Sequence, residues 1–155
     1  MKTARHVLSW IPIGLSLVLL AGCPKQPVKV NVVLNAASAI NQDAGGQALS
    51  VVVRIYQLKD KGRLESADYN AIWKSDKVAL SDDLLEQQER IVQPGTQEMI
   101  EIQTNPMARY LGAVALFRNP SGDNWRRIIP IGKSKTQKVS LTLRDQTIEF
   151  SSSAR

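Results

Sequence analysis

Histidine and cysteine are nearly absent from this chain, which has one residue of each among 155. The histidine is His6, near the N-terminus, and the cysteine is Cys23. If the N-terminal segment is removed on export, as predicted below, the remaining chain cannot form a Ser-His-Asp triad, a Cys–His pair or an ordinary His/Cys zinc site. A single cysteine also excludes an internal disulfide, so the fold must rest on its hydrophobic core. We therefore expect neither an enzyme nor a metal site.

A site made of carboxylates alone stays open as a weaker alternative. Asp82, Asp83 and Glu86 lie close together in the sequence and could be assembled into a hydrolase site. Acidic pairs at a turn or helix start are far more often helix caps or solvent-facing residues. We expect that second role for them.

A long apolar run is also missing. The longest stretch, about residues 7–21, is interrupted by proline, glycine and serine, and it is shorter than the ~20 residues that span a bilayer. Two basic residues precede this stretch and small residues end it just before Cys23. That order is typical of an export signal. We predict that residues 1–22 are a signal peptide rather than a membrane-spanning helix.

The charge of the chain is modestly basic, with 20 Lys and Arg against 14 Asp and Glu. The basic residues are dispersed, with short clusters only at Arg126-Arg127 and at Lys133, Lys135 and Lys138. No stripe of basic residues with interleaved aromatics is present, so we do not expect nucleic-acid binding. Attraction to anionic lipid or to an acidic partner stays open.

Most of the remaining chain has the two-residue apolar period of β-strands. Val28, Val30, Val32 and Leu34 fall on one face of the first such segment. The segment Gln93-Pro94-Gly95-Thr96 predicts a hairpin turn. The strands expected after the first lie at residues 49–58, 87–92, 97–103, 110–118, 125–131 and 138–144, with a short edge strand at 147–150.

One segment has helical spacing instead. In residues 65–74, Tyr69, Ile72 and Trp73 fall on one helical face, and Ser66 is placed to cap the helix. An aromatic stripe of this kind usually packs onto a core rather than holding a cofactor. Seven or eight short strands with one helical insertion predict an all-β fold, a two-sheet β-sandwich over residues 28–150. Residues 151–155 are expected to form a disordered tail.

A polar segment separates the first two strands. Residues 35–48 are small, polar and rich in alanine and glycine, which predicts a long loop. Hairpin links usually contain about two to five residues, and loops near a dozen residues tend to be functional or disordered. A docking loop and a simple surface excursion both fit this pattern.

The end of the export signal carries a first resemblance. Leu20-Ala21-Gly22-Cys23 resembles the lipobox of bacterial lipoproteins, in which the cysteine thiol receives a diacylglycerol and the new amino terminus an acyl chain such as palmitate. Because Pro24 rather than aspartate follows Cys23, the resemblance implies sorting to the outer membrane, facing the periplasm. Residues 23–27 would form a short lipidated tether, stiffened by proline. No other cofactor is expected.

The order of segments after the lipobox resembles the TssJ family, the outer-membrane lipoproteins of the bacterial type VI secretion system. The resemblance covers most of residues 16–150 and implies a transthyretin-like β-sandwich with a small helical insertion. The segments that carry it are VVVRIYQLKD, an ADY helix, SDDLL, Gln93-Pro94-Gly95, YLGAVALFR and Trp125-Arg126.

The same resemblance implies a partner. In this family the lipoprotein binds the periplasmic C-terminal domain of TssM, an inner-membrane protein that builds a trans-envelope membrane complex together with TssL. The loop between the first two strands is the part that engages TssM. Carried onto this sequence, the loop is about Ala36 to Ala48. The residues expected to be most exposed in it are Asn41, Gln42, Asp43, Gly45 and Gly46. The candidate binding residues are Ala36, Asn41, Gln42, Asp43, Gly45, Gly46, Gln47 and Ala48.

A periplasmic carrier that binds a small ligand is the alternative from another class. Tyr56, Trp73 and Trp125 could line a cavity between the two sheets of such a protein. The same three residues are more simply explained as parts of the core.

Overall fold

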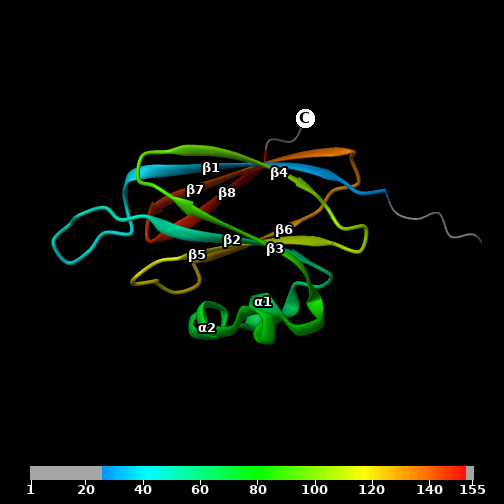
Figure 1. Ribbon diagram of the computed structural model, residues 1–155, viewed down its shortest axis with the longest axis horizontal. Helices are drawn as coiled ribbons and strands as arrows, with labels where there is room; N and C mark the ends of the chain where they lie inside the picture. The colour runs from blue at the N-terminus through cyan, green and yellow to red at the C-terminus, as the bar shows by residue number, and fades with distance from the viewer. Residues whose placement is uncertain (1–25, 153–155) are drawn as a thin grey trace, which may run out of the picture.

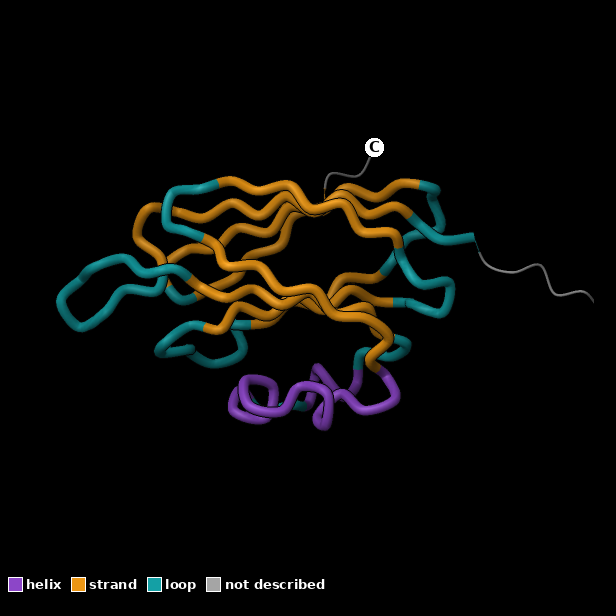
Figure 2. The backbone as a smooth tube through the Cα atoms, in the orientation of Figure 1, coloured by secondary structure: helices purple, strands orange, loops and turns teal. Residues whose placement is uncertain are grey.

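The computed structural model describes residues 26–152, which form a β-sandwich of two four-stranded sheets with a helical layer on one side (Figures 1 and 2). The predicted signal peptide, Cys23, Pro24 and residues 153–155 lie outside the described residues. No helix within residues 26–152 is long and apolar enough to cross a membrane. The strands are β1 (Lys29–Ile40), β2 (Val51–Leu58), β3 (Leu84–Val92), β4 (Gln97–Gln103), β5 (Tyr110–Leu116), β6 (Arg126–Pro130), β7 (Thr136–Asp145) and β8 (Thr147–Ser152).

The two sheets divide the strands in an order that differs from their order along the chain. Sheet A has the order β4-β1-β7-β8, and sheet B has the order β3-β2-β5-β6. β1 runs parallel to β7 and antiparallel to β4, so the first strand is a central strand of its sheet. The edge strand predicted near residues 147–150 is β8, and it continues through Ser151 and Ser152, which were expected in a disordered tail.

The core between the sheets follows from the alternation seen in the sequence. Val30, Val32 and Leu34 of β1 are at most 1% exposed and face the interior. Val139, Leu141 and Leu143 of β7 are equally buried beside them. Each strand therefore presents one apolar face to the other sheet, as a half-buried strand with period two requires.

The helical insertion covers the outer face of sheet B (Figure 1). It consists of α1 (Gly62–Ser66), α2 (Tyr69–Leu80) and the 3₁₀ turn η1 (Ser81–Asp83). Gly112 in β5 permits close approach of this layer, because a Cβ atom there would overlap the buried side chain of Leu64.

Polar anchors fix the helical layer to the sheet. The Arg126 guanidinium donates to the carbonyl oxygens of Leu64 and Ala67 at the end of α1. The hydroxyl of Tyr69 donates to the carbonyl oxygen of Phe117. These bonds satisfy carbonyl groups that the short helix and the end of β5 leave without ladder partners.

The helix boundaries differ from the prediction. Ser66, expected to begin a helix, is the last residue of α1, and Asp68 caps α2 by accepting a hydrogen bond from the N–H of Ala71 at 3.0 Å. Ile72 is fully buried, but Trp73 is 52% exposed. The aromatic stripe therefore packs on the core only in part.

The Pro94-Gly95 segment makes a turn, as predicted, but not a hairpin. β3 pairs with β2 in sheet B, whereas β4 pairs with β1 in sheet A, so the turn carries the chain from one sheet to the other. Gly95 adopts a φ of +73°, which glycine tolerates without strain. Its N–H donates to the carbonyl oxygen of Ala37 in β1 at 3.1 Å. The turn residues predicted that the chain reverses direction here. Which strands β3 and β4 pair with depends on the packing of the two sheets and not on the turn.

The two ends of the sandwich carry different features (Figure 1). The described chain begins at Gln26 at one end, where β1 starts. The loop between β1 and β2 projects from the opposite end. The sandwich therefore separates the expected tether from the expected binding loop by its full length.

Candidate functional site

The loop between β1 and β2 covers residues 41–50, which is shorter than the predicted Ala36–Ala48 (Figure 2). Ala36 lies within β1, is 9% exposed and pairs with Leu143 of β7. Alanine and serine have low β-propensity, so residues 35–40 gave no strand signal, yet pairing with β7 extends β1 through Ile40. Ala36 is thus a core residue and not part of the loop surface.

Asn41 is buried at the base of this loop and holds the two ends of the loop together. It was expected to be among the most exposed loop residues, but only 4% of it is accessible. Its side-chain amide donates to the carbonyl oxygen of Ser50 at 2.8 Å, joining the two feet of the loop. Its side-chain oxygen accepts from the N–H of Arg118 at 2.8 Å, and its own N–H donates to the carbonyl oxygen of Asp145 at 2.8 Å. Asn41 therefore joins the β1–β2 loop to the β5–β6 connection and to the turn between β7 and β8.

The backbone conformation at Asn41 also favours asparagine. Its φ is +49°, in the left-handed region that asparagine occupies more readily than most residues. Asp145, its backbone partner, has a φ of +51°. The hydrogen bonds around Asn41 hold this conformation and fix the direction in which the loop leaves β1.

Asp43 organises the tip of the loop. One of its carboxylate oxygens accepts hydrogen bonds from the N–H groups of Gly45 and Gln47, both at 2.9 Å. Its backbone N–H donates to the Gln47 carbonyl oxygen, and its carbonyl oxygen accepts from the N–H of Gly46. Gly46 has a φ of +81°, which a residue with a side chain would adopt only with strain. The tip of the loop is therefore an ordered, hydrogen-bonded turn and not an irregular surface loop.

The exposed surface of the loop is small and polar. Gln42, Gly45, Gly46 and Gln47 are exposed as predicted, while Asp43 and Ala48 are half-buried. The sequence interpretation missed Ala44, which is also exposed. It also missed Arg118 and Asp145, because hydrogen bonds to backbone groups distant in sequence leave no local pattern. The surface that a partner could meet is therefore residues 42–47.

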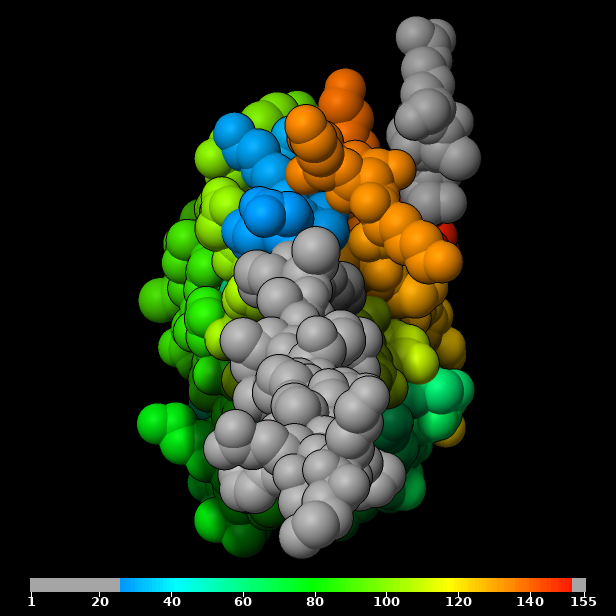
Figure 3. Space-filling view, turned by 90° about the vertical axis from the view of Figure 1, so that its right-hand side faces the viewer, coloured from blue at the N-terminus to red at the C-terminus, as the bar shows by residue number. Residues whose placement is uncertain are grey.

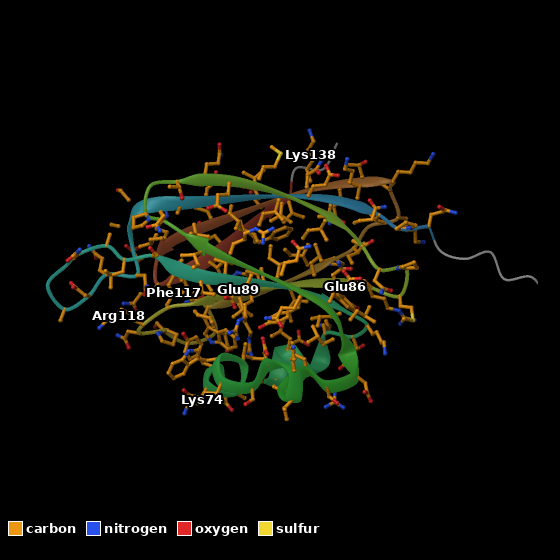
Figure 4. The ribbon with its side chains drawn as sticks, in the orientation of Figure 1. Lys74, Glu86, Glu89, Phe117, Arg118 and Lys138 are labelled. Carbon is orange, nitrogen blue, oxygen red and sulfur yellow. The ribbon has the colours of Figure 1, made fainter. Side chains whose placement is uncertain are left out.

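A shallow pocket of about 210 Å³ lies near the loop, between α2 and the end of β5. Tyr69, Trp73 and Arg118 contribute to its walls, together with Leu116 and Phe117. Figure 4 places Phe117 and Arg118 at the loop-bearing end of the molecule. The three aromatic residues proposed for a carrier cavity do not share one space: Tyr56 and Trp125 are buried in the core, whereas Trp73 reaches solvent.

The three carboxylates considered for a hydrolase site have structural partners or face solvent. Asp83 forms an ion pair with Arg63 at 3.3 Å, and Glu86 accepts from the side-chain amide of Gln57 at 3.0 Å. Asp82 is exposed in η1. Within the described part of the chain, no group of three or more acidic, histidine or cysteine residues is arranged to hold a metal ion.

The strongest electrostatic network lies beneath α2 and joins Arg54, Tyr56 and Asp76. One Asp76 carboxylate oxygen accepts from Arg54 at 3.1 Å and from the hydroxyl of Tyr56 at 2.9 Å. Burial raises the pKa of Tyr56, and the negative charge of Asp76 raises it further. Burial lowers the pKa of Arg54, but its hydrogen bond to Glu89 and its neighbours outweigh that effect, so the pKa lies above the ordinary value. The network holds α2 on sheet B.

Comparison with known proteins identifies the family. The sequence profile described as "Type VI secretion lipoprotein, VasD, EvfM, TssJ" matches residues 28–146, which is nearly the whole sandwich. The chain belongs to the TssJ family. A comparison with curated protein sequences finds no match. The family shown here is the one that the segment order predicted, and its description places the chain among membrane-anchored lipoproteins of the bacterial envelope.

Solved structures support the same assignment. TssJ1 from Pseudomonas aeruginosa, described as a T6SS lipoprotein, is 32% identical, with a TM-score of 0.78 over 83% of this chain and 98% of that one. A chain of a structure described as "Type VI membrane complex" is 30% identical, with a TM-score of 0.75 over 81% of this chain and 99% of that one. The TssJ-family β-sandwich with its helical insertion is therefore confirmed.

A third solved structure is described as "T6SS protein TssM C-terminal domain (869-1107) from EAEC". A chain in it is 30% identical to this one, with a TM-score of 0.70, and the match covers 79% of this chain and 99% of that one. The matched chain is thus close in length to the TssJ-family sandwich.

Proposed function

We propose that this TssJ-family chain is an outer-membrane foothold of a type VI secretion membrane complex. Lipid on Cys23 holds it in the membrane, and residues 42–47 bind the periplasmic C-terminal domain of TssM, through which it is linked to TssL. The protein acts by binding and is not an enzyme. The observation that carries this proposal is the rigid loop, built on Asn41 and Asp43 at the end of the sandwich opposite Gln26.

The rigidity of the loop supports a binding role. A loop that is ordered before it meets its partner loses less conformational entropy on binding, so more of the contact energy appears as affinity. Asn41 and Asp43 use their side chains to order the backbone, which leaves exposed amide and glycine surfaces for a partner. A surface excursion without a function would not need a buried asparagine at its base.

The similar structures support the identity of the partner. One matched chain comes from a structure described as a type VI membrane complex, and another from a structure described by the TssM C-terminal domain. The match covers 79% of the present 155 residues and 99% of the other chain. That other chain is therefore much shorter than a fragment with the range 869–1107. That difference favours a TssJ-like chain beside the TssM domain in that structure.

Membrane anchoring would reduce the affinity that the loop must supply. TssM is itself held in the inner membrane, so the two proteins meet in a confined space rather than in free solution. Confinement raises the effective concentration of each partner for the other. A modest contact through residues 42–47 could then sustain the assembly.

The binding experiment uses the mature chain without its lipid, from Pro24 onward, and a TssM periplasmic fragment of the same organism. In the test variant, residues 42–48 are replaced by Asn-Gly, which closes the loop between Asn41 and Leu49 with a short turn. The control variant changes Ser134 to glycine in an exposed turn at the opposite end. We expect the control to bind normally and the shortened variant to lose binding by at least about tenfold.

Two outcomes would contradict the proposal. Normal binding by the shortened variant would remove the loop from the interface. Absence of binding by the unaltered chain, with a correctly folded TssM fragment, would remove TssM as the partner. Circular dichroism and thermal melting of both variants would show that the sandwich is retained.

The lipid anchor is tested separately. Replacing Cys23 with serine should release the protein from membranes and stop secretion while the sandwich stays folded. Replacing Pro24 with aspartate should move the lipoprotein to the inner membrane. Recovery of the Cys23→Ser protein in washed membranes with secretion intact would contradict the anchor, and unchanged fractionation of Pro24→Asp would contradict the sorting argument.

A further inference from the structure

The two ends of the sandwich differ in charge. At the end where β1 begins, the connecting segments are residues 26–28, 59–61, 81–83, 104–109 and 131–135. These segments carry five basic side chains against three carboxylates: Lys59, Lys61, Arg109, Lys133 and Lys135, and Asp60, Asp82 and Asp83. Asp83 is paired with Arg63 of α1 at 3.3 Å. The loops at the opposite end, residues 41–50, 93–96 and 117–125, carry Arg118 against Asp43 and Asp123.

Backbone hydrogen bonds join the segments of the basic end into one surface. The N–H of Lys29 donates to the carbonyl oxygen of Lys135, and the N–H of Thr104 donates to that of Val28, both at 2.9 Å. The carbonyl oxygen of Arg109 accepts from Ile131 at 2.8 Å. Figure 3 views this end and shows the blue, yellow-green and orange segments side by side. The basic residues are thus held together by the fold rather than by chance orientation of loops.

The charge of this end is not neutralised within the protein. Lys59, Arg109, Lys133 and Lys135 are exposed, and no carboxylate of the described residues lies within ion-pair distance of any of them. Lys61 is paired with Glu65 at 2.9 Å. The carboxylate of Asp60 accepts from the N–H of Gly62. Four cations therefore face outward without a partner of opposite charge in this part of the chain.

An apolar side chain projects among these cations. Met107 is 60% exposed in the segment between β4 and β5. It lines an open pocket of about 490 Å³ together with Lys59, Asp60, Pro106 and Arg109. Basic residues around a flexible apolar side chain are the composition of a surface that lies on anionic lipid, where the cations meet phosphate groups and the apolar group enters the headgroup layer.

We infer that this basic end lies on anionic phospholipid headgroups and holds the sandwich upright on the membrane. The inference rests on the lipid anchor at Cys23 in the proposed function. Cys23 precedes Gln26 by three residues, which span at most about 11 Å when fully extended. The anchor therefore keeps the basic end within about one Debye length of the headgroups, where attraction between exposed charges is still effective.

A lipid surface fits this end better than an acidic protein does. The short chain to Cys23 places a membrane directly against these segments, whereas a protein would have to enter the narrow space between them. The lipid chains already supply membrane residence, so the cations supply orientation. With the basic end on the membrane, the loop of residues 41–50 points away from it, toward the space in which the partner would be met.

The test uses the lipidated mature protein in nanodiscs. Because the thiol of Cys23 is consumed by lipid, an introduced cysteine is the only free thiol and accepts a spin label. One variant carries Met107→Cys at the basic end, and the other carries Ala44→Cys in the distal loop. Accessibility to a water-soluble relaxing agent is compared in discs of phosphatidylcholine and in discs of equal parts phosphatidylcholine and phosphatidylglycerol.

We expect the label at position 107 to be at least about threefold less accessible in the anionic discs, and the label at position 44 to be equally accessible in both. Salt near about 1 M should remove the difference, because it shortens the Debye length to about 3 Å. The pair Lys133→Glu and Lys135→Glu should also remove it. The matched pair Lys74→Glu and Lys77→Glu, on exposed positions of α2, should leave it unchanged.

Three outcomes would overturn the inference. Equal accessibility at position 107 in both kinds of disc would show that this end does not engage anionic lipid. An equal effect of the two lysine pairs would show a response to net charge alone. Loss of TssM-fragment binding in the Lys133 and Lys135 variant, with accessibility unchanged, would assign the surface to a protein. The intact mass reports lipidation, so failure of the anchor is distinguished from failure of the orientation.

Discussion

The side-chain oxygen of Asn41 accepts a 2.8 Å hydrogen bond from the backbone N–H of Arg118, which lies 77 residues further along the chain. This bond ties the base of the loop between β1 and β2 to the connection between β5 and β6. Asn41 directly follows β1 of sheet A, and Arg118 lies just after β5 of sheet B. The position of the loop is therefore set by both sheets together.

Replacement of Asn41 by alanine should loosen the loop and destabilise the sandwich. The change removes two part-buried side-chain hydrogen bonds and leaves the N–H of Arg118 and the carbonyl oxygen of Ser50 without these partners. We expect a loss of about 2–4 kcal/mol in the free energy of unfolding, since each unsatisfied buried group costs about 1–3 kcal/mol. Chemical denaturation measures the loss, and hydrogen exchange of residues 42–48 should become faster.

Asn41→Gly separates the two roles of the residue. Glycine keeps the positive φ of +49° without strain but makes no side-chain hydrogen bond. If the hydrogen bonds dominate, the glycine variant should lose nearly as much stability as the alanine variant. A glycine variant as stable as the unaltered protein would show that only the backbone conformation matters at this position.

Replacement of Asp43 by alanine should weaken partner binding with little effect on global stability. The tip loses the oxygen that orders Gly45 and Gln47, and the hydrogen bonds of Asp43 in the described chain all lie within the loop. The free loop would sample more conformations, so we expect about five- to tenfold weaker binding of the TssM fragment. Calorimetry measures this effect, and Ala44→Ser, an exposed change without a hydrogen-bonding role, is the control. Equal binding by both variants would show that tip order is unimportant.

Gly112→Ala should destabilise the contact between the helical layer and sheet B. The new Cβ atom would overlap the fully buried side chain of Leu64, which has little room to move. Overpacking of this kind costs about 1–3 kcal/mol. A second change, Leu64→Val, should restore part of the loss in thermal or chemical unfolding. Additive losses in the double variant would contradict the close approach described here.

Asp76→Ala should destabilise the protein more than removal of any exposed ion pair. The change leaves the mostly buried Arg54 without its inner carboxylate and the hydroxyl of Tyr56 without its acceptor. We expect a loss of about 2–4 kcal/mol, somewhat below the value for a fully buried pair. Glu89 pairs with the other side of Arg54 and is 47% exposed, so Glu89→Ala should cost less than about 1 kcal/mol.

Stability should fall at alkaline pH because of Tyr56. Its pKa in the folded protein is raised by burial and by Asp76, above the unfolded value of about 10. A raised pKa means that its stabilising effect is complete below about pH 10 and is lost as the pH rises beyond that value. Urea unfolding between about pH 9 and pH 12 measures the decline. The decline should be smaller in Tyr56→Phe, and an unchanged slope would assign it to other groups.

The strands with clean alternation were predictable because their burial depends on side chains close together in sequence. β4 has the predicted bounds, and β7 extends the predicted strand by only a few residues. The strand pattern predicted a sandwich with one helical insertion, and the family resemblance added its transthyretin-like form. Residues 35–40 were not predictable in this way, since small residues carry no periodic signal and their strand conformation depends on pairing with β7.

The length of the polar segment predicted where the binding loop lies. It did not predict which residues of the loop form hydrogen bonds or are buried. Exposure of Gln42, Gly45 and Gly46 was predicted from the polar, glycine-containing composition of the segment. The burial of Asn41 depends on Arg118 and Asp145, which are distant in the chain and contribute backbone groups. Backbone donors and acceptors are present at every residue, so the sequence does not mark which of them will meet.

The placement of β1 in the middle of sheet A has a consequence for biogenesis. The first strand to be made has no neighbour in its own sheet until residues 97–103 exist, and its second neighbour comes only with residues 136–145. Sheet A therefore cannot close while the ribosome is still adding the last quarter of the chain. Delayed closure leaves the edges of β1 unpaired until the chain is nearly complete, a state in which folding is slow and exposed strand edges are prone to aggregate.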